Sequence, residues 1–205
     1  SGESGLDRIN RVQAAMREHY RVLGELVTPY ITAGVPILTT GHCYAVGAEA
    51  TDRQDNIYLG NTENIAATDF PDIFSYVALG HIHRPQMVGQ LNHVRYSGSL
   101  IPLSFSETKD DKGVYQLTYT GAHLEDVTFR PLPVFRRLKT IEASPDDAEE
   151  KLRRFAARRE PGLTPWVEIL VEAESVPPQF DMTLRELGAE LGVEGMTCAS
   201  CSAAV

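Results

Sequence analysis

Three histidines in this chain come shortly after apolar runs that end in glycine. His81 and His83 come after the apolar residues 77–79 and a glycine, and His42 comes after residues 37–41, which also end in glycine. Imidazole nitrogens are common ligands for zinc, iron, copper and nickel, and they serve manganese in mixed sites. Alternate residues of an extended chain point the same way, so we expect His81 and His83 to converge. By itself, a His-x-His pair is also typical of two hydrogen-bonded surface histidines.

The repeated pattern of apolar run, glycine and histidine favours a shared site. The apolar runs predict two buried strands, and in α/β proteins ligands bind outside the carboxyl ends of such strands. If the two strands are neighbours, His42 lies near His81 and His83. The sequence therefore predicts a partial metal site built from three histidines.

Other segments of the chain predict the elements that hold these residues. Apolar residues recur every three or four positions over residues 6–27, which predicts an amphipathic helix that packs on the core. Residues 86–96 and 114–129 alternate around turns and predict hairpins. Beyond residue 133 the pattern is strand, helix, strand, helix, which indicates a small α+β module.

Composition and charge narrow the class of protein. The chain has 205 residues, of which 42% are hydrophobic, so a real core is possible. No run approaches the roughly 18 apolar residues of a membrane span, and no signal peptide is recognisable, so we expect a cytoplasmic protein. Because the chain begins at Ser1 without methionine, we interpret it as processed or as a fragment. The net charge of -9 argues against non-specific polyanion binding by the whole surface.

Longer stretches around the histidines resemble a known family. Gly41-His42, residues 76–86 with Gly-His-Ile-His at 80–83, and residues 93–107 with Arg-Tyr-Ser-Gly-Ser at 95–99 resemble the SbcD exonuclease subunit family of calcineurin-like metallophosphoesterases. The Gly-His-Ile-His motif marks only the superfamily, whereas the stretch through Pro-Leu-Ser-Phe at 102–105 is much more specific. The resemblance spans about residues 6–192.

The resemblance implies a function and a fold. It implies a two-metal phosphodiesterase, typically with Mn2+, that cuts DNA as exonuclease and endonuclease in repair, recombination and replication. The partner would be an SbcC-like ATPase, with the nuclease subunit a homodimer within a heterotetramer. Two family histidines match His42 and His81 and are expected on one ion, and a third matches His83 and is expected on the other. The expected fold class is α/β, as the C-terminal half of a metallophosphoesterase β-sandwich flanked by helices and followed by a small α+β capping domain.

The chain also departs from the family. The family motifs Asp-x-His, Gly-Asp and Gly-Asn-His-Asp, which carry a bridging aspartate and further ligands, are absent from the 205 residues. We therefore expect this chain alone to be inactive or nearly so. The Ser-Gly-Ser loop at residues 97–99 is interpreted either as a structural turn or as part of the site.

The expected domains are residues 1–130 for the nuclease part, 134–194 for the capping domain and 195–205 for an atypical cysteine-containing tail. Its Cys198-x-x-Cys201 resembles the loop of heavy-metal-associated copper-binding domains, and two thiolates suit Cu(I). A frayed tail with exposed thiols is the simpler interpretation.

Two other functions stay open on the sequence. One is a metallophosphoesterase that acts on small phosphoesters, against which the match over residues 96–105 and the capping module speak. The other is a non-catalytic fragment that docks DNA or an ATPase without cutting. Mn2+ binding that is lost when His81 is replaced by alanine would favour a formed metal site over a non-catalytic scaffold.

Overall fold

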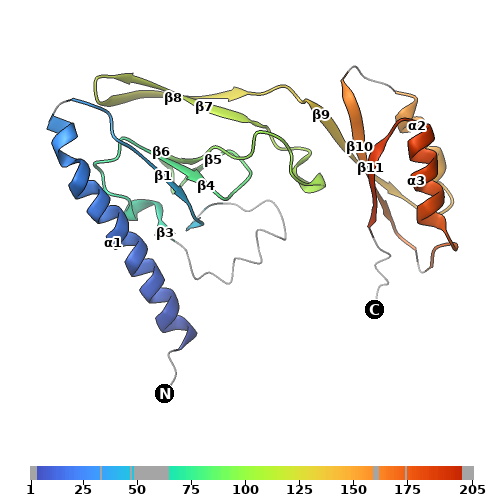
Figure 1. The fold of residues 1–205 in the computed structure, drawn as a ribbon, viewed down its shortest axis with the longest axis horizontal. Coiled ribbons are helices and arrows are strands. Elements are labelled where there is room, and N and C mark those ends of the chain that lie inside the picture. The colour runs from blue at the N-terminus through green and yellow to red at the C-terminus, as the bar shows by residue number, and fades with distance from the viewer. Residues whose placement is uncertain are drawn as a thin grey trace. The chain divides into compact units, whose positions relative to one another are not determined.

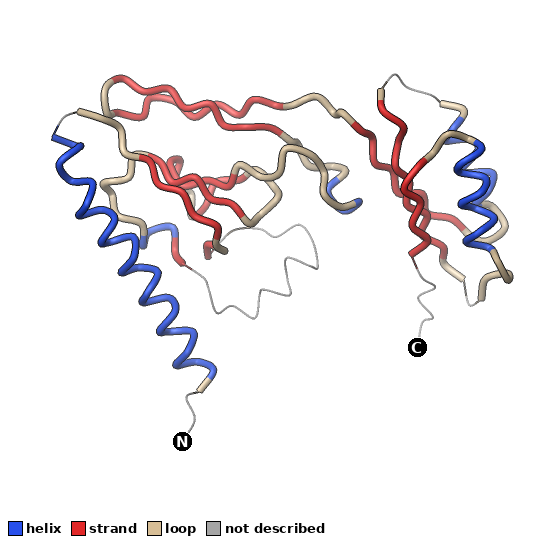
Figure 2. The backbone as a smooth tube through the Cα atoms, viewed as in Figure 1, coloured by secondary structure: helices blue, strands red, loops and turns tan. Residues whose placement is uncertain are grey.

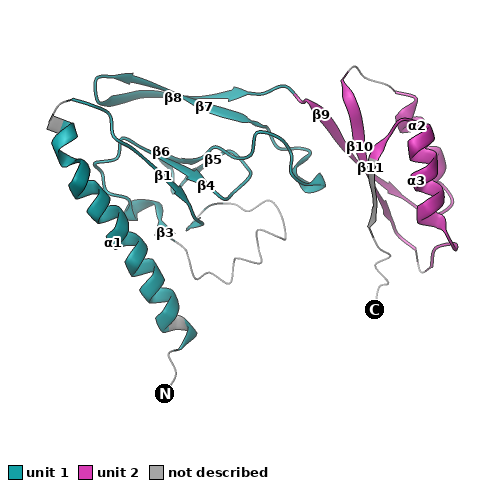
Figure 3. Cartoon of the chain, in the orientation of Figure 1, with its two compact units in different colours: residues 1–133 teal, residues 134–205 magenta. Residues whose placement is uncertain are grey.

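The computed structural model describes residues 4–32, 34–46, 48, 65–158, 162–173 and 175–199. The chain divides into two compact units, Ser1–Pro133 and Val134–Val205 (Figure 3). Each unit has its own hydrophobic core, as expected for parts of a chain that bury their apolar side chains separately.

The candidate metal ligands lie in the first unit. Its elements are α1 (Gly5–Thr32), β1 (Leu38–His42), β2 (Ala45–Val46), β3 (Ile65–Ala66), the 3-10 helix η2 (Ala67–Asp69), β4 (Tyr76–Gly80), β5 (Gln86–Val88), β6 (Leu91–Tyr96), the 3-10 helix η3 (Phe105–Glu107), β7 (Gly113–Thr120) and β8 (His123–Pro131) (Figure 1). A four-stranded sheet has the order β1-β4-β6-β5, and two-stranded sheets pair β2 with β3 and β7 with β8.

The first three strands of that order are parallel, and β5 pairs antiparallel to β6. Leu38 lies opposite Tyr76 and His42 lies opposite Gly80, so β1 and β4 end together at one edge of the sheet. The two apolar runs form strands, and the condition for a shared site, that these strands are neighbours, is met. Strand β4 is largely buried as predicted, whereas β1 lies at the edge of the sheet with Leu38 exposed.

The helix α1 lies beside this sheet (Figure 1), and the apolar face predicted for it packs on the core. Tyr20 is buried, and Met16, Leu23 and Val27 contact the same core. Gly41 is required where helix and strand meet, because a Cβ built on it would lie 2.2 Å from the Tyr20 hydroxyl oxygen. A methyl group cannot approach an oxygen that closely.

The two predicted hairpins are also confirmed. The turn between β5 and β6 uses Gly89 and Gln90, with φ of 58° and 60°, which is the backbone of a two-residue turn that follows the twist of the strands. Strands β7 and β8 form a long antiparallel pair (Figure 2).

The second unit is a three-stranded parallel sheet with two helices. Its elements are β9 (Arg136–Ala143), α2 (Ala148–Ala156), β10 (Leu163–Val171), α3 (Phe180–Glu190) and β11 (Glu194–Ala199). The order β11-β10-β9 places β10 in the centre. Leu152 of α2 and Leu184 of α3 share one buried core with Val167 and Ile169, so both helices cover the same face of the sheet.

The end of this unit differs from the sequence-based expectation. We expected the chain to leave the module at residue 195, but residues 194–199 form β11 and place Cys198 opposite Ile169 of β10. The physical reason is that the chain returns from α3 beside an open edge of β10, whose backbone groups need partners. The backbone of Cys198 therefore belongs to a sheet, while Cys201 lies outside the described residues.

Candidate metal centre

His42 and His81 meet at the edge where β1 and β4 end. His42 is the last residue of β1 and His81 follows β4 directly. Their ring centroids lie 5.4 Å apart with an interplanar angle of 77°. Gly80 leaves room for this arrangement, because a Cβ there would lie 3.0 Å from Nδ1 of His42. The predicted proximity of His42 to His81 is confirmed.

The backbone of His81 is unusual. Its φ of 108° lies outside the regions favoured by residues with a Cβ atom. The strand ends at Gly80, so His81 and His83 do not belong to an extended segment. The expected extended backbone is therefore not observed, because the chain bends at His81, and the convergence of the two side chains stays a prediction. Strained backbone of this kind is found most often at functional sites.

The separation of His42 and His81 is compatible with two ligands of one metal ion. Imidazole nitrogens are common ligands of divalent ions, so the donor chemistry of this pair fits a metal ion that the two rings would share. In the part of the chain that the structure describes, no group of three or more His, Cys, Asp or Glu side chains could hold a metal by itself.

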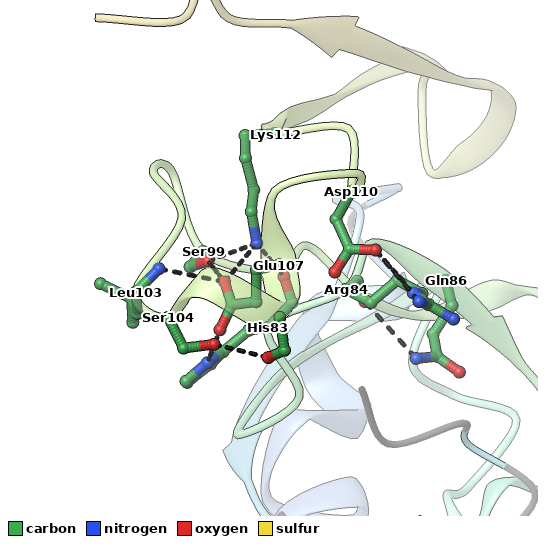
Figure 4. A network of polar contacts seen from close by, with 10 residues as sticks. His83, Arg84, Gln86, Ser99, Leu103, Ser104, Glu107, Asp110 and Lys112 are labelled. Atoms are coloured by element: carbon green, nitrogen blue, oxygen red, sulfur yellow. Dashed lines mark hydrogen bonds and ion pairs between the residues drawn. The ribbon is translucent and has the colours of Figure 1, made fainter. Parts of the chain in front are cut away.

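His83 belongs to a network of polar contacts (Figure 4). Its Nδ1 lies 2.8 Å from Oε1 of Glu107. Oε2 of the same carboxylate accepts a 2.6 Å hydrogen bond from the Lys112 ammonium. The side chains of Glu107 and Lys112 are only 1% and 7% exposed, whereas that of His83 is 36% exposed. A half-exposed imidazole is therefore held by a buried ion pair.

Burial by itself would raise the pKa of Glu107. Hydrogen bonds from Lys112, His83 and the Leu103 backbone N–H outweigh that effect, and the pKa of the carboxyl group is lowered from its usual 4.5. Each of these donors stabilises the charged form. Glu107 is therefore a carboxylate at neutral pH.

The loop at residues 97–99 lies against His83. The Ser99 N–H donates to the His83 carbonyl at 3.1 Å, and the Ser99 hydroxyl donates to Glu107 at 3.3 Å. Gly98 has a φ of 77°, and a Cβ on it would lie 2.7 Å from the His83 carbonyl oxygen. Only glycine permits this approach, so the loop packs against the backbone carbonyl of His83.

The segment after His42 is held by Tyr96 at the end of β6. The Tyr96 hydroxyl donates to the Cys43 carbonyl and accepts from the Ala45 N–H, each at 2.6 Å. Tyr96 is fully buried, and that burial raises the pKa of its hydroxyl. The hydroxyl therefore remains a donor at neutral pH.

Sequence reasoning did not identify Glu107, Lys112 and Tyr96 as neighbours of the predicted ligands. Glu107 ended the stretch that resembles the SbcD family, but no spacing rule connects it to His83 across 24 residues of sequence. The signal available in the sequence is an acidic and a basic residue five positions apart, Glu107 and Lys112, directly after a serine-rich loop.

Strand order and site together define a mixed α/β chain whose fold is consistent with part of a metallophosphoesterase. Within the described residues, no helix is long and apolar enough to cross a membrane. No protein-family model matches the chain.

The relatives of this chain are nuclease subunits. The chain is 30% identical over 196 residues to the SbcD subunit of the SbcCD nuclease of Escherichia coli strain K12, a match that covers 95% of this chain and 48% of that protein. The same values hold for the SbcD protein of Escherichia coli O157:H7. This similarity supports membership of the SbcD family, at a distance, as the sequence motifs predicted. The chain spans about half the length of the curated relatives it matches.

Proposed function

We propose that this chain is the part of an SbcD-like DNA nuclease subunit that supplies three histidine ligands to a two-metal centre. The observation that carries the proposal is the pair of His42 and His81, whose rings lie 5.4 Å apart at the ends of neighbouring parallel strands. The name of the relatives, a subunit of a nuclease, supports the same reaction class. Residues 1–130 would belong to the nuclease domain, and the module from residue 134 through the strand β11 at residues 194–199 would form a capping domain.

Each histidine has a role in this proposal. His42 and His81 hold one ion and His83 holds the other, with Mn2+ as the expected metal. Bound divalent ions would supply Lewis-acid stabilisation of a phosphodiester and an activated water. The chain's own contribution is to hold imidazoles at fixed positions: Gly80 makes room for His42, and Glu107 with Lys112 holds His83. The proposed partners are DNA and an SbcC-like ATPase, with the nuclease subunit dimeric within that complex.

We further propose that the 205-residue chain alone does not cut DNA. The family motifs Asp-x-His, Gly-Asp and Gly-Asn-His-Asp, with their bridging carboxylate, are absent from these residues. Histidines without a bridging carboxylate hold two divalent cations poorly, because the charge between the ions is not compensated.

A titration with Mn2+ tests the metal site. The wild-type chain is expected to bind Mn2+ in calorimetry, and His81→Ala is expected to lose that binding. His123→Ala is the matched control, because His123 lies exposed at the turn between β7 and β8. Equal binding by wild type and His81→Ala would contradict the proposal and favour a non-catalytic docking fragment.

Incubation with a labelled DNA duplex and Mn2+ tests the lack of activity. No cleavage above background is expected. Robust cleavage that disappears in His81→Ala would show that the described histidines suffice, and the view that further carboxylates are needed would be wrong.

A further inference from the structure

The contacts around His83 hold both its ring and its backbone. Oε1 of Glu107 lies 2.8 Å from the ring nitrogen Nδ1, and the Lys112 ammonium donates to the His83 carbonyl at 3.0 Å. The same ammonium lies 2.6 Å from Oε2 of Glu107. The ring of His83 thus contacts the Glu107 carboxylate, the carboxylate contacts the Lys112 ammonium, and the ammonium contacts the backbone carbonyl of His83 (Figure 4).

These contacts select one tautomer of the imidazole. An ionised carboxylate can only accept hydrogen bonds, so its contact with Nδ1 requires a proton on that nitrogen. In the neutral ring the lone pair then lies on Nε2. A metal ion binds through the lone pair, and histidine ligands commonly donate their other N–H to a carboxylate.

The rest of the network fixes the carboxylate. Oε2 of Glu107 also accepts a hydrogen bond from the Leu103 N–H at 3.1 Å and one from the Ser99 hydroxyl at 3.3 Å. A buried ion pair is seldom more stabilising than apolar side chains of the same size. A contribution to folding stability therefore does not explain why Glu107 and Lys112 are buried as an ion pair. Orientation of the half-exposed His83 imidazole does explain it.

We propose that Glu107 and Lys112 are positioning residues for His83. Glu107 holds the ring with the proton on Nδ1 and leaves Nε2 free for a divalent metal ion, and Lys112 fixes both the carboxylate and the backbone of His83. The metal in this inference rests on the proposed function, but the tautomer is a property of the metal-free chain.

Nitrogen-15 NMR of the histidine side chains in the metal-free chain tests the tautomer, at a pH where the spectra themselves show neutral rings. Wild-type His83 is expected to carry its proton on Nδ1. A proton on Nε2 would overturn the inference without any variant, so this result does not depend on whether a substituted chain folds.

Variants test the positioning residues. The double substitution Glu107→Leu with Lys112→Met removes both ends of the ion pair and keeps an apolar volume similar to the original. His83 is then expected to become a mixture of tautomers. Glu107→Gln leaves a single acceptor oxygen, which is expected to stay with the donors Lys112, Leu103 and Ser99. Its amide N–H then faces Nδ1 and is expected to move the His83 proton to Nε2. Asp110→Asn is the control, since Asp110 pairs with Arg84. An unchanged tautomer in the double variant would overturn the inference.

Broadening of the His83 ring signals by paramagnetic Mn2+ gives the metal readout. The double variant is expected to need about 10–100-fold more Mn2+ than wild type for the same broadening, Glu107→Gln is expected to be weakened as well, and Asp110→Asn is expected to be unchanged. Equal requirements in all four chains would overturn the role of Glu107 in metal binding. No broadening in the wild-type chain would overturn metal binding by His83 in this chain, while the tautomer would still decide whether Glu107 orients the ring.

Discussion

The Tyr96 hydroxyl donates a 2.6 Å hydrogen bond to the carbonyl of Cys43, across 53 residues of sequence. The same oxygen accepts from the Ala45 N–H. Tyr96 ends β6, and Cys43 follows the candidate ligand His42 directly. The third strand of the sheet thus fixes the segment that leaves the first strand at the candidate metal centre.

Tyr96→Phe is expected to lower the free energy of unfolding by about 1–3 kcal/mol, because it leaves buried backbone groups without a partner. Urea denaturation measures the change. Tyr119→Phe is the control, since its hydroxyl contacts Ser75 at 3.1 Å in a partly buried position. A loss in Tyr96→Phe no larger than in the control would show that the hydroxyl is not needed to hold residues 43–45.

A double-mutant cycle with Mn2+ tests the assignment of histidines to ions. If His42 and His81 hold one ion, the effects of His42→Ala and His81→Ala on binding are not additive, with an interaction of about 0.5–3 kcal/mol. His83→Ala should leave that ion bound. Calorimetry of the three single variants and the His42/His81 double variant measures these terms. Additive losses for His42 and His81 would place them on different ions.

Much of the first unit follows from simple sequence patterns. Two apolar runs that end in glycine and histidine predicted two strands, and their parallel pairing as neighbours brought His42 to His81 because both strands end on the same side of the sheet. The helix α1 followed from its apolar period, although it extends to Thr32 and includes Pro29 near its end. Local periodicity is sufficient for these features because each depends on one element or one strand pair.

Other features depend on contacts between distant residues. The contact of His83 with Glu107 depends on how the loop at residues 97–99 folds back, which no local pattern specifies. The φ of His81 depends on its surroundings and contradicts what strand alternation implied. The strand β11 was not predicted because its sequence resembles the loop of another family. It forms because the open edge of β10 offers unpaired backbone groups with which it can pair.

The lowered pKa of Glu107 predicts a dependence of stability on pH. A carboxyl group whose pKa is lower in the folded state contributes stability that is fully present above its unfolded pKa, near 4.5, and that is lost as the pH falls through the folded value. Wild type is therefore expected to lose stability relative to Glu107→Gln as the pH falls below about 4.5.

Urea denaturation of both proteins over a range from neutral to about pH 3 measures this difference. The other carboxyl groups are common to both proteins, so their contributions cancel in the comparison. A difference in unfolding free energy that stays constant with pH would contradict a lowered pKa for Glu107.

The positive φ of His81 predicts a conflict between stability and metal binding. Glycine adopts a φ of 108° without the steric cost that a Cβ atom imposes. Relief of this strain is worth about 1–3 kcal/mol and exceeds the roughly 0.5–1 kcal/mol that glycine costs in chain entropy. His81→Gly is therefore expected to be about 1 kcal/mol more stable than His81→Ala, because both variants lose the ring contacts of His81 with His42 and Tyr44 and only glycine relieves the strain. Both variants are expected to lose Mn2+ binding.

Gln90→Gly is the matched control for this substitution. Gln90 also has a positive φ, of 60°, but this value lies in the left-handed region where strain is smaller. The glycine and alanine variants of Gln90 should differ less in stability than those of His81, and Mn2+ binding by Gln90→Gly should equal that of wild type. Thermal denaturation and calorimetry on the same samples measure both quantities. If His81→Gly is no more stable than His81→Ala, the backbone conformation of His81 is not a strain retained for the sake of the site.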